Sequence, residues 1–289
     1  MSICSVTVTF NPDTPTLIKQ LISLNKQVGN IIVVDNGSTN LSQIKEIITK
    51  YDVEFIALHE NKGLSYAQNV GVAKARALSA QYVLLLDQDS VLNNGFVSSI
   101  FKVYTDSGVG ILGPTFFDPA TNNIYKGTNY FGPFIKTKPI TSLTDVTYVI
   151  ASGSFFSIEV FDKVGPMNED LFVDYIDVDW SLRAKKLGYR VAMTNITSMS
   201  HTIGDSRINF LGRTISVHSP TRRYFLVRNS FYMLRQSYIP IGYKVRELSL
   251  NLVRALISLY ISKNKKETFF MIRKGMKDGL MGVYGPMSK

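Results

Sequence analysis

Two carboxylates one residue apart follow an apolar run of this chain. The segment YVLLLDQDS (82–90) leads directly into Asp87-Gln88-Asp89-Ser90. Two close anions repel each other, so a cation is expected beside them. Paired oxygen ligands suit Mg²⁺ or Mn²⁺, which keep open positions for substrate phosphates. The alternative is that Asp89 or Ser90 caps a following helix.

Similar polar turns follow the other apolar runs of the first 110 residues. Short β-branched segments at 4–10, 30–36, 53–58 and 82–87 predict strands, and helical spacing predicts helices at 14–27, 41–51 and 64–79. This alternation indicates an α/β fold with a mostly parallel sheet covered by helices. Ligands bind such sheets at the carboxyl ends of the strands. The turns 10–12, 35–38 and 87–89 are therefore expected to meet at one edge.

The regular alternation weakens after residue 110. Residues 113–134 are rich in Gly, Asn and Pro, which predicts a loop or an irregular hairpin. Residues 146–158 have strand character around Ala151-Ser152-Gly153, and residues 168–193 read as an acidic loop, a helix and a strand. The absence of repeats and of low-complexity linkers gives no reason to assume an independent second domain.

Several common chemistries lack their sequence signatures. The chain has one cysteine and three histidines, without a G-x-G-x-x-G, P-loop, H-E-x-x-H or G-x-S-x-G motif. A disulfide framework and a cysteine-rich zinc site are excluded. We expect a cytoplasmic protein, because the N-terminus has no signal-peptide pattern and no apolar stretch approaches the ~20 residues of a membrane span.

The charge of the chain is concentrated at its C-terminal end. Residues 1–200 have 16 Lys and Arg against 18 Asp and Glu, whereas residues 201–289 have 16 against 4. The second part therefore carries a net charge of +12 and predicts an anionic partner or a solvated basic surface. A nucleic-acid binder would explain the basic tail, but the acidic strand ends would repel phosphates. A nucleotidyltransferase, which would use a metal and a nucleotide, is a stronger candidate than a nucleic-acid binder. However, Asn11-Pro12 replaces the Gly-rich basic loop that such enzymes usually need.

Residues 244–262 predict an amphipathic helix. Val245, Leu248, Leu252, Ala255 and Leu259 share one face, and Glu247, Asn251, Arg254 and Ser258 lie opposite. A basic amphipathic helix can rest on an anionic membrane or pack against the body of the protein. The pattern leaves both alternatives open.

Five segments in register give the chain a family resemblance. TFNP, IIVVDNGS, NKGLSYAQNVGVAKA, LLLDQDS and FVDYIDVDWSLRAKKLGY resemble glycosyltransferase family 2, over roughly residues 3–230. The Asp-Gln-Asp-Ser form is most similar to bacterial rhamnosyltransferases of O-antigen and other surface polysaccharides. The resemblance implies a GT-A (Rossmann-like) fold over 1–215, with a nucleotide-sugar half (1–110) and an acceptor half (111–215), followed by a basic helical region (216–289).

The resemblance also assigns roles to individual residues. Asp177 matches the catalytic base of these inverting enzymes, and Asp89 and His201 match ligands of a divalent metal, Mg²⁺ or Mn²⁺. The family commonly has Glu-Asp where this chain has Ile176-Asp177, so Asp174 and Asp179 remain alternative bases. The nucleotide-sugar site is expected to include Thr9, Asn11, Asp35, Asn36, Gly63, Gln68, Asp87 and Gln88. The acceptor site is expected to include Gly153, Ser154, Asp174, Asp179, Trp180, Arg222 and Arg223.

The partners follow from the same resemblance. The donor is expected to be a nucleoside-diphosphate sugar, with dTDP-rhamnose favoured, and the acceptor a polyprenyl-diphosphate-linked glycan. The basic C-terminal region would place the enzyme on the anionic inner face of the cell membrane. No nucleic acid is expected as a partner.

Overall fold

The computed structural model describes residues 2–117, 123–200, 206–210 and 213–288. Its contacts divide the chain into two compact units. Unit 1 comprises Met1–Asn129, Thr137–Glu169 and Ile176–Thr202, and unit 2 comprises Tyr130–Lys136, Asp170–Tyr175 and Ile203–Lys289. The functional boundary expected at residue 215 stays a prediction.

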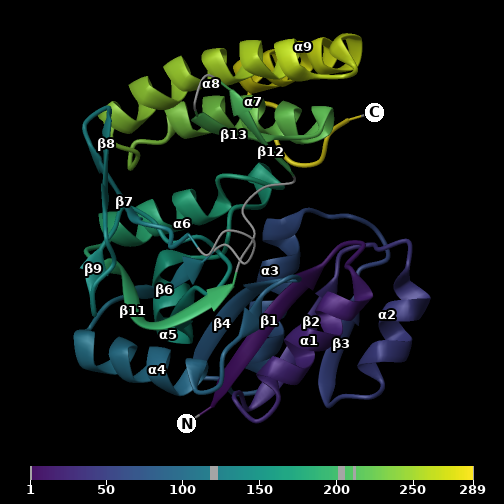
Figure 1. Ribbon diagram of the computed structural model, residues 1–289, viewed down its shortest axis with the longest axis vertical. Coiled ribbons are helices and arrows are strands. Elements are labelled where there is room, and N and C mark those ends of the chain that lie inside the picture. The colour runs from purple at the N-terminus through teal and green to yellow at the C-terminus, as the bar shows by residue number, and fades with distance from the viewer. Residues whose placement is uncertain (1, 118–122, 201–205, 211–212, 289) are drawn as a thin grey trace. The chain divides into compact units, whose positions relative to one another are not determined.

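A mixed, mostly parallel sheet forms the centre of unit 1 (Figure 1). Its strands are β1 (Ile3–Thr9), β2 (Asn30–Asp35), β3 (Val53–Ala57), β4 (Tyr82–Asp87), β5 (Val91–Leu92), β6 (Ile111–Phe117), β9 (Thr144–Asp145), β10 (Phe155–Ser157) and β11 (Val191–Ser200). They follow the order β3-β2-β1-β4-β10-β6-β11-β5, and β9 pairs with β11. The strands β1 to β4 are parallel, and β10 joins them to β6 in antiparallel pairing. The predicted fold class is confirmed.

Helices pack against this sheet because their apolar positions recur at helical spacing. They are α1 (Thr14–Leu24), α2 (Leu41–Ile48), α3 (Leu64–Ala77), α4 (Phe96–Ser107), α5 (Ile158–Val164) and α6 (Ile176–Lys186). In α1, Leu17, Leu21 and Leu24 are fully buried, and the Asp13 carboxylate caps the first turn by accepting from Thr16 N. In α3, Gly71 permits close packing, because an added Cβ would lie 2.2 Å from Val6 Cγ1.

The structure corrects two local expectations. The strand expected over 146–158 is reduced to β10, whereas the hairpin expected within 113–134 is present: β7 (Gly127–Phe131) pairs with β8 (Phe134–Lys138) after the end of β6. Asp89 and Ser90 do not cap a helix: the short strand β5 follows them, and α4 begins after Gly95. The helix-capping alternative for Asp89 and Ser90 is therefore excluded.

Three helices make up most of unit 2. They are α7 (Pro220–Arg235), α8 (Ile241–Ile261) and α9 (Lys265–Met281), preceded by the hairpin of β12 (Ser206–Phe210) and β13 (Arg213–Val217). Helices α7 and α9 approach closely at Gly275 and Gly279, where an added Cβ would lie 2.7 Å from Tyr224 O and 2.6 Å from Phe231. The predicted helical C-terminal region is confirmed.

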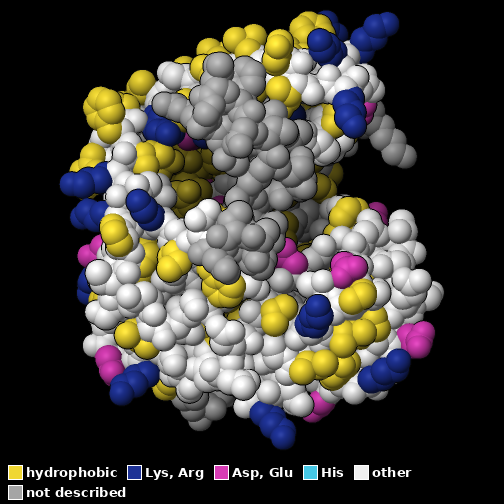
Figure 2. Space-filling view, in the orientation of Figure 1, with side chains coloured by type: hydrophobic (Ala, Val, Ile, Leu, Met, Phe, Trp, Pro, Cys, Tyr) yellow, Lys and Arg dark blue, Asp and Glu magenta, His cyan; other side chains and the backbone are white. Residues whose placement is uncertain are grey.

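Helix α8 is amphipathic, but its polar face is buried and its apolar face is exposed. Tyr243, Glu247, Asn251 and Ser258 are its buried residues. The exposed apolar side chains of α8 are Ile241, Val245, Leu248, Leu252, Val253, Leu256 and Tyr260, and those of α9 are Phe269, Phe270, Met276, Leu280 and Met281. We call these twelve residues the apolar C-terminal surface; Figure 2 shows hydrophobic side chains over these helices at the top of the view. Within the described residues, no helix is long and apolar enough to cross a membrane.

Candidate active site

Hydrogen bonds join the turns after β1, β2 and β4 at one edge of the sheet. The amide of Phe10 donates to Gln88 Oε1 (2.8 Å), and the amide of Asn11 donates to Ser38 Oγ (2.8 Å). Asn11 Oδ1 in turn accepts from both Thr39 N and Thr39 Oγ1, at 2.8 Å each. The three polar turns therefore meet as expected from the parallel strand order.

Asp35, which is predicted to belong to the nucleotide-sugar site, organises its own turn. Its side chain is fully buried and accepts from Thr9 Oγ1 (3.1 Å), Ser38 Oγ and Ser38 N (3.0 Å). Asn36 links this turn to the start of α3, because its oxygen accepts from Lys62 N and its amide donates to Asn61 Oδ1. Contact of Thr9, Asp35 or Asn36 with a nucleotide stays a prediction.

The buried side-chain amide of Gln20 stabilises the turn that carries Asp87 and Asp89. Gln20 of α1 donates to the carbonyls of Asp87 (2.6 Å) and Ser90 (2.9 Å), and the Ser90 hydroxyl lies 2.6 Å from that of Ser152. Both carboxylates are half-buried at this edge. Gln20 was not among the site residues predicted from the sequence; its signal is a polar residue on the apolar face of α1, between Leu17 and Leu21.

Next to this turn, Gly153-Ser154 pairs with β4. Gly153 N donates to Leu85 O (2.7 Å), and Leu85 N donates to Ser154 O (3.0 Å). Gly153 has φ +77°, and an added Cβ would lie 2.7 Å from both Met199 Sδ and Pro114 Cγ, so only glycine fits. Two segments predicted for donor and acceptor thus run side by side in unit 1.

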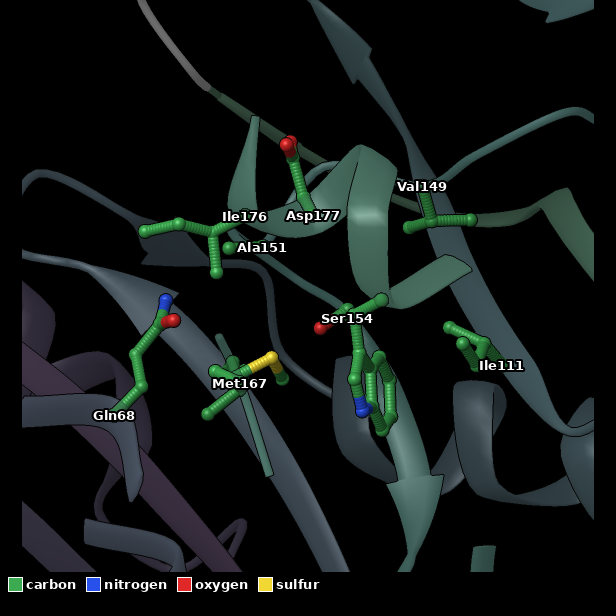
Figure 3. A pocket seen from close by; sticks show the side chains of 10 residues that line it. Gln68, Ile111, Val149, Ala151, Ser154, Met167, Ile176 and Asp177 are labelled. Carbon is green, nitrogen blue, oxygen red and sulfur yellow. The ribbon is translucent and has the colours of Figure 1, made fainter. Parts of the chain in front are cut away.

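A pocket in unit 1 brings four predicted site residues together (Figure 3). Its empty volume is about 240 Å³ including its open mouth, and Gln68, Ser154, Asp177 and Trp180 are among its lining residues. Gln68 is only 3% exposed, and its Oε1 has no hydrogen-bond partner among the described residues. A buried acceptor without a partner is costly, so Gln68 is suited to accept from a ligand hydroxyl.

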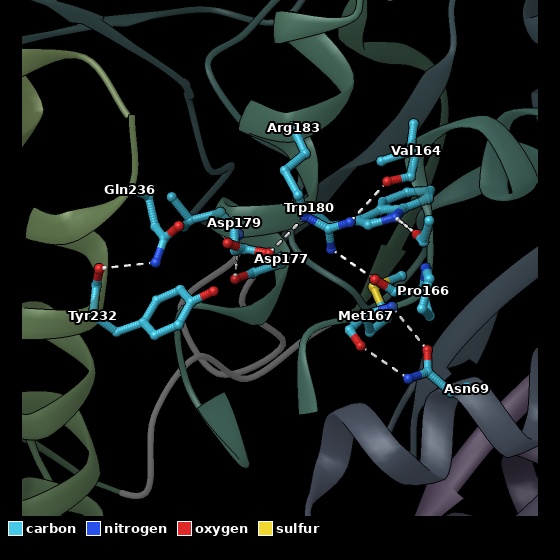
Figure 4. Close-up of polar contacts among 12 residues, drawn as sticks. Asn69, Val164, Pro166, Met167, Asp177, Asp179, Trp180, Arg183, Tyr232 and Gln236 are labelled. Atoms are coloured by element: carbon cyan, nitrogen blue, oxygen red, sulfur yellow. Dashed lines mark hydrogen bonds and ion pairs between the residues drawn. The ribbon is translucent and has the colours of Figure 1, made fainter. Parts of the chain in front are cut away.

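Helix α6 presents Asp177 and Asp179 in different surroundings. Asp177 is half-buried at the rim of the pocket, and its side chain points away from Met167 and Ser154 (Figure 3). Asp179 is 0% exposed and accepts from Arg183 Nε (2.9 Å), while the same guanidinium donates to the carbonyls of Val164 and Pro166 (Figure 4). This burial in an ion pair favours Asp177 over Asp179 as a proton acceptor.

Trp180 belongs to the core next to these aspartates. Its indole nitrogen donates to Gly165 O (2.9 Å), and its ring packs on Phe156 and Phe161. The ring reaches the pocket as part of its lining. A stacking contact with a sugar stays a prediction.

The third candidate base, Asp174, lies in unit 2 in a strained segment. Phe172, Asp174 and Tyr175 have φ between 62° and 66°, a region that costs ~1–3 kcal/mol per residue outside glycine. Asn229 stabilises the segment by donating to the carbonyls of Leu171, Val173 and Asp174. The Asp174 carboxylate accepts from Arg222 Nε and Nη2 at 3.0–3.3 Å, which occupies it with a cation of its own unit.

The candidate metal ligands fit a metal site whose coordination is completed by the substrate. Among the described residues, no three His, Cys, Asp or Glu side chains form a metal-binding cluster, and His201 lies outside those residues. Asp87 and Asp89 supply two carboxylates, which is the protein share that Mg²⁺ commonly takes when substrate phosphates complete its coordination. The donor set therefore fits Mg²⁺ or Mn²⁺ only together with a phosphate ligand.

The segment that contains this edge of the sheet identifies the protein family of the chain. Residues 4–165, which include the turns after β1, β2 and β4 and most of the pocket lining, match the model for "Glycosyl transferase family 2". The chain belongs to glycosyltransferase family 2. The predicted family and the predicted enzyme class, a glycosyltransferase, are confirmed.

Relatives of this glycosyltransferase share most of its length. It is 32% identical over 293 residues to the dTDP-rhamnosyl transferase RfbF of Shigella flexneri, covering 98% of this chain and 97% of that one. It is 21% identical to the low-salt glycan biosynthesis hexosyltransferase Agl10 of Haloferax volcanii, covering 74% of this chain and 72% of that one.

Solved structures share the fold of this glycosyltransferase. GalNAc-T7 with UDP, GalNAc and Mn²⁺ superposes with a TM-score of 0.63 at 16% identity, over 98% of this chain and 56% of that chain. S. aureus TarS 1-349 in complex with UDP-GlcNAc superposes with a TM-score of 0.56 at 18% identity, over 98% of this chain and 82% of that chain. At these identities the likeness shows the fold alone.

Proposed function

We propose that this glycosyltransferase transfers L-rhamnose from dTDP-rhamnose to a hydroxyl of a lipid-linked glycan, with inversion at the anomeric carbon. The product would be a precursor of a bacterial surface polysaccharide such as O-antigen. The observation that carries the proposal is the match to a dTDP-rhamnosyl transferase along 98% of the chain. The two-carboxylate turn and the pocket beside Asp177 support it.

The donor would bind at the edge where the three turns meet. Asp89 and Asp87 would hold a divalent metal together with the donor diphosphate, and His201 is a further candidate ligand. When bound, the metal would offset the negative charge that develops on the leaving nucleoside diphosphate. Gln68 would accept a hydrogen bond from a donor hydroxyl, because its buried oxygen has no partner among the described residues.

Asp177 would act as the general base. The attacking hydroxyl must lose a proton, and the half-buried carboxylate of Asp177, one of the residues that line the pocket, would accept it. Asp179 is buried in an ion pair with Arg183, and Asp174 is bonded to Arg222, so both are less suited to this role. Attack by the acceptor on the face opposite the leaving diphosphate inverts the anomeric configuration. Gly153, Ser154 and Trp180 would line the acceptor side of the same pocket.

The C-terminal helices support the proposed acceptor and the proposed location of the enzyme. The apolar C-terminal surface exposes Leu252, Leu256, Phe269 and Leu280, with the exposed basic residues Lys263, Lys265, Lys266, Arg273 and Lys277 on or between α8 and α9. Apolar side chains flanked by Lys and Arg match an interface of anionic lipids. The enzyme would therefore work on the inner face of the cell membrane, where a polyprenyl-diphosphate-linked acceptor is accessible.

A paired substitution tests the site and the donor together. The full chain is incubated with dTDP-rhamnose, UDP-GlcNAc and UDP-galactose, with Mn²⁺ or with EDTA, while the melting temperature is measured; turnover is then measured with a lipid-linked acceptor. We expect a Mn²⁺-dependent rise in melting temperature that is largest with dTDP-rhamnose. Asp177→Asn should keep this rise and lose at least 10³-fold in turnover, whereas Asp89→Asn should lose both.

Asp106→Asn, an exposed aspartate of α4, is the matched control and should behave as wild type. Near-normal turnover by Asp177→Asn would refute the assigned base. Preference for a UDP-sugar would refute the rhamnosyl donor. Release of pyrophosphate in place of nucleoside diphosphate would indicate a nucleotidyltransferase.

A further inference from the structure

Arg223 of α7 is a buried cation without an ion pair in the described part of the chain. Its side chain is 4% exposed, and its Nε atom makes no hydrogen bond. A guanidinium stays charged and has five donors, so its burial without partners is strongly unfavourable. A group that costs this much in the folded protein needs a compensating anion.

Arg228 on the same helix shows how this protein stabilises a structural buried arginine. Its guanidinium donates to Asn229 Oδ1 and to the carbonyls of Asp170, Leu171 and Gly285, and it stacks on Phe225. Arg228 is therefore saturated by its own unit. Arg223, one turn and a residue earlier on α7, has no comparable set of partners.

The surroundings of Arg223 in unit 2 are cationic. Burial, the largest cause, and the nearby guanidinium groups of Arg254 and Arg222 lower the pKa of Arg223 to about 10, while Tyr175 and Asp174 act in the opposite direction. Arg222 is bonded to Asp174, and Arg254 and Arg246 share the buried Glu247, which also accepts from the Tyr175 hydroxyl. Four guanidinium groups thus face two carboxylates, which leaves a net charge of +2.

The excess charge indicates the chemistry of the ligand. Arginine forks match phosphate oxygens, and a diphosphate that is esterified at both ends carries two negative charges. A carboxylate or a single phosphodiester would neutralise only one of the two cations. We propose that Arg223, with Arg222 and Arg254 beside it, binds the diphosphate diester of a substrate.

Two substrates of the proposed function contain this group. A nucleotide sugar and a polyprenyl-diphosphate-linked glycan are both diphosphate diesters, so the inference rests on the proposed glycosyl transfer. Either ligand would contact Arg223 through its diphosphate. Measuring the affinity for each ligand alone shows which of the two binds there.

Calorimetry on the full chain tests the site. The ligands are dTDP-rhamnose with Mn²⁺ and a water-soluble short-chain prenyl diphosphate esterified with N-acetylglucosamine. The variants are Arg223→Gln, Arg223→Lys, and Arg76→Gln, an exposed arginine of α3 in unit 1, as the matched control. We expect Arg223→Gln to bind one of the two diesters at least tenfold more weakly, Arg223→Lys to be intermediate, and Arg76→Gln to bind both as wild type does.

The melting temperature separates a ligand-binding arginine from a structural one. Removal of an uncompensated buried charge should leave the melting temperature of Arg223→Gln unchanged or raise it, whereas Arg228→Gln should lower it. Weaker binding of the lipid analogue assigns the site to the acceptor, and weaker binding of dTDP-rhamnose assigns it to the donor. Wild-type affinity of Arg223→Gln for both diesters, or a melting temperature that falls as in Arg228→Gln, would overturn the inference. If the wild-type protein binds neither diester, the proposed function fails as well.

Discussion

Side-chain amides hold the backbone of the turn that carries Asp87 and Asp89. Gln20 donates to the carbonyls of Asp87 and Ser90 at the two ends of the turn, and Gln88 accepts from the amide of Phe10 in the turn after β1. Two anions can therefore be kept at fixed positions before any cation arrives. Such preorganisation would lower the cost of assembling the proposed metal–diphosphate site.

The role of Gln20 leads to a prediction for Gln20→Leu. The substitution leaves the carbonyls of Asp87 and Ser90 without this donor, which costs ~1–3 kcal/mol for each buried group that stays unpaired. We expect a lower melting temperature and, at a temperature where the variant is fully folded, weaker Mn²⁺-dependent binding of the donor. Calorimetry with dTDP-rhamnose measures the second effect. Gln43→Leu, on the exposed face of α2, is the control and should change neither quantity; unchanged donor affinity in Gln20→Leu would contradict a positioning role.

The sequence predicted where the polar residues lie better than what each of them contacts. Alternation of strands and helices placed the turns after β1, β2 and β4 at one edge, because parallel strands share a direction. It could not assign Gln20, whose partners lie 67 and 70 residues away. It also could not separate Asp177 from Asp179, since their difference arises from Arg183 and the carbonyls that Arg183 reaches.

At the scale of elements, helical periodicity identifies two faces but not which of them is buried. The sequence placed Leu248 and Leu252 opposite Glu247 and Asn251 on α8, and an ordinary amphipathic helix would bury the leucines. The structure buries Glu247 and Asn251, because the Tyr175 hydroxyl donates to Glu247 and accepts from Asn251. These partners come from a segment 72 to 76 residues earlier, so local patterning could not predict the inversion.

Close packing of α7 and α9 leads to a prediction for Gly275→Ala. In an open helix this change would stabilise by up to ~1 kcal/mol. Here the new Cβ would lie 2.7 Å from Tyr224 O, a backbone atom that cannot move away easily, and overpacking costs ~1–3 kcal/mol. The clash should outweigh the propensity gain, so we expect a lower free energy of unfolding in urea, followed by circular dichroism. Ser249→Ala on the exposed face of α8 should be neutral or slightly stabilising; a stabilised Gly275→Ala would show that the helices separate without cost.

The molecule as a whole divides its charge and its exposed apolar residues unequally along the chain. Residues 1–200 have a net charge of −2 and contain the strand-end carboxylates, whereas residues 201–289 carry +12 and contain the apolar C-terminal surface. An apolar surface of this kind in water is a liability unless a partner covers it. The accompanying lysines and arginines favour an anionic lipid surface as that partner over a second basic copy of the chain, which like charge would repel.

Vesicle flotation tests this arrangement on the full chain. We expect binding to vesicles of phosphatidylglycerol and phosphatidylcholine, and weaker binding to phosphatidylcholine alone, because each nearby Lys or Arg adds ~1 kcal/mol on an anionic surface. Raising the salt to about 1 M shortens the screening length to ~3 Å, so binding should weaken but persist through the apolar contacts. Leu252→Glu with Leu256→Glu, at side chains 55% and 68% exposed, should abolish it.

Ile22→Glu in α1 is the matched control, because this isoleucine is 58% exposed in unit 1 and belongs to no apolar surface of α8 or α9. It should float as the wild type does. Sedimentation of the same proteins without lipid tests whether a second copy of the chain covers this surface instead. A dimer that the Leu252 and Leu256 substitutions dissociate, together with no flotation on any vesicle, would assign the surface to a second copy. A monomer that floats only with the leucines intact would place the lipid-linked acceptor and the transferase on the same membrane, since inverted α8 turns its apolar face outward and keeps Glu247 with its arginines inside unit 2.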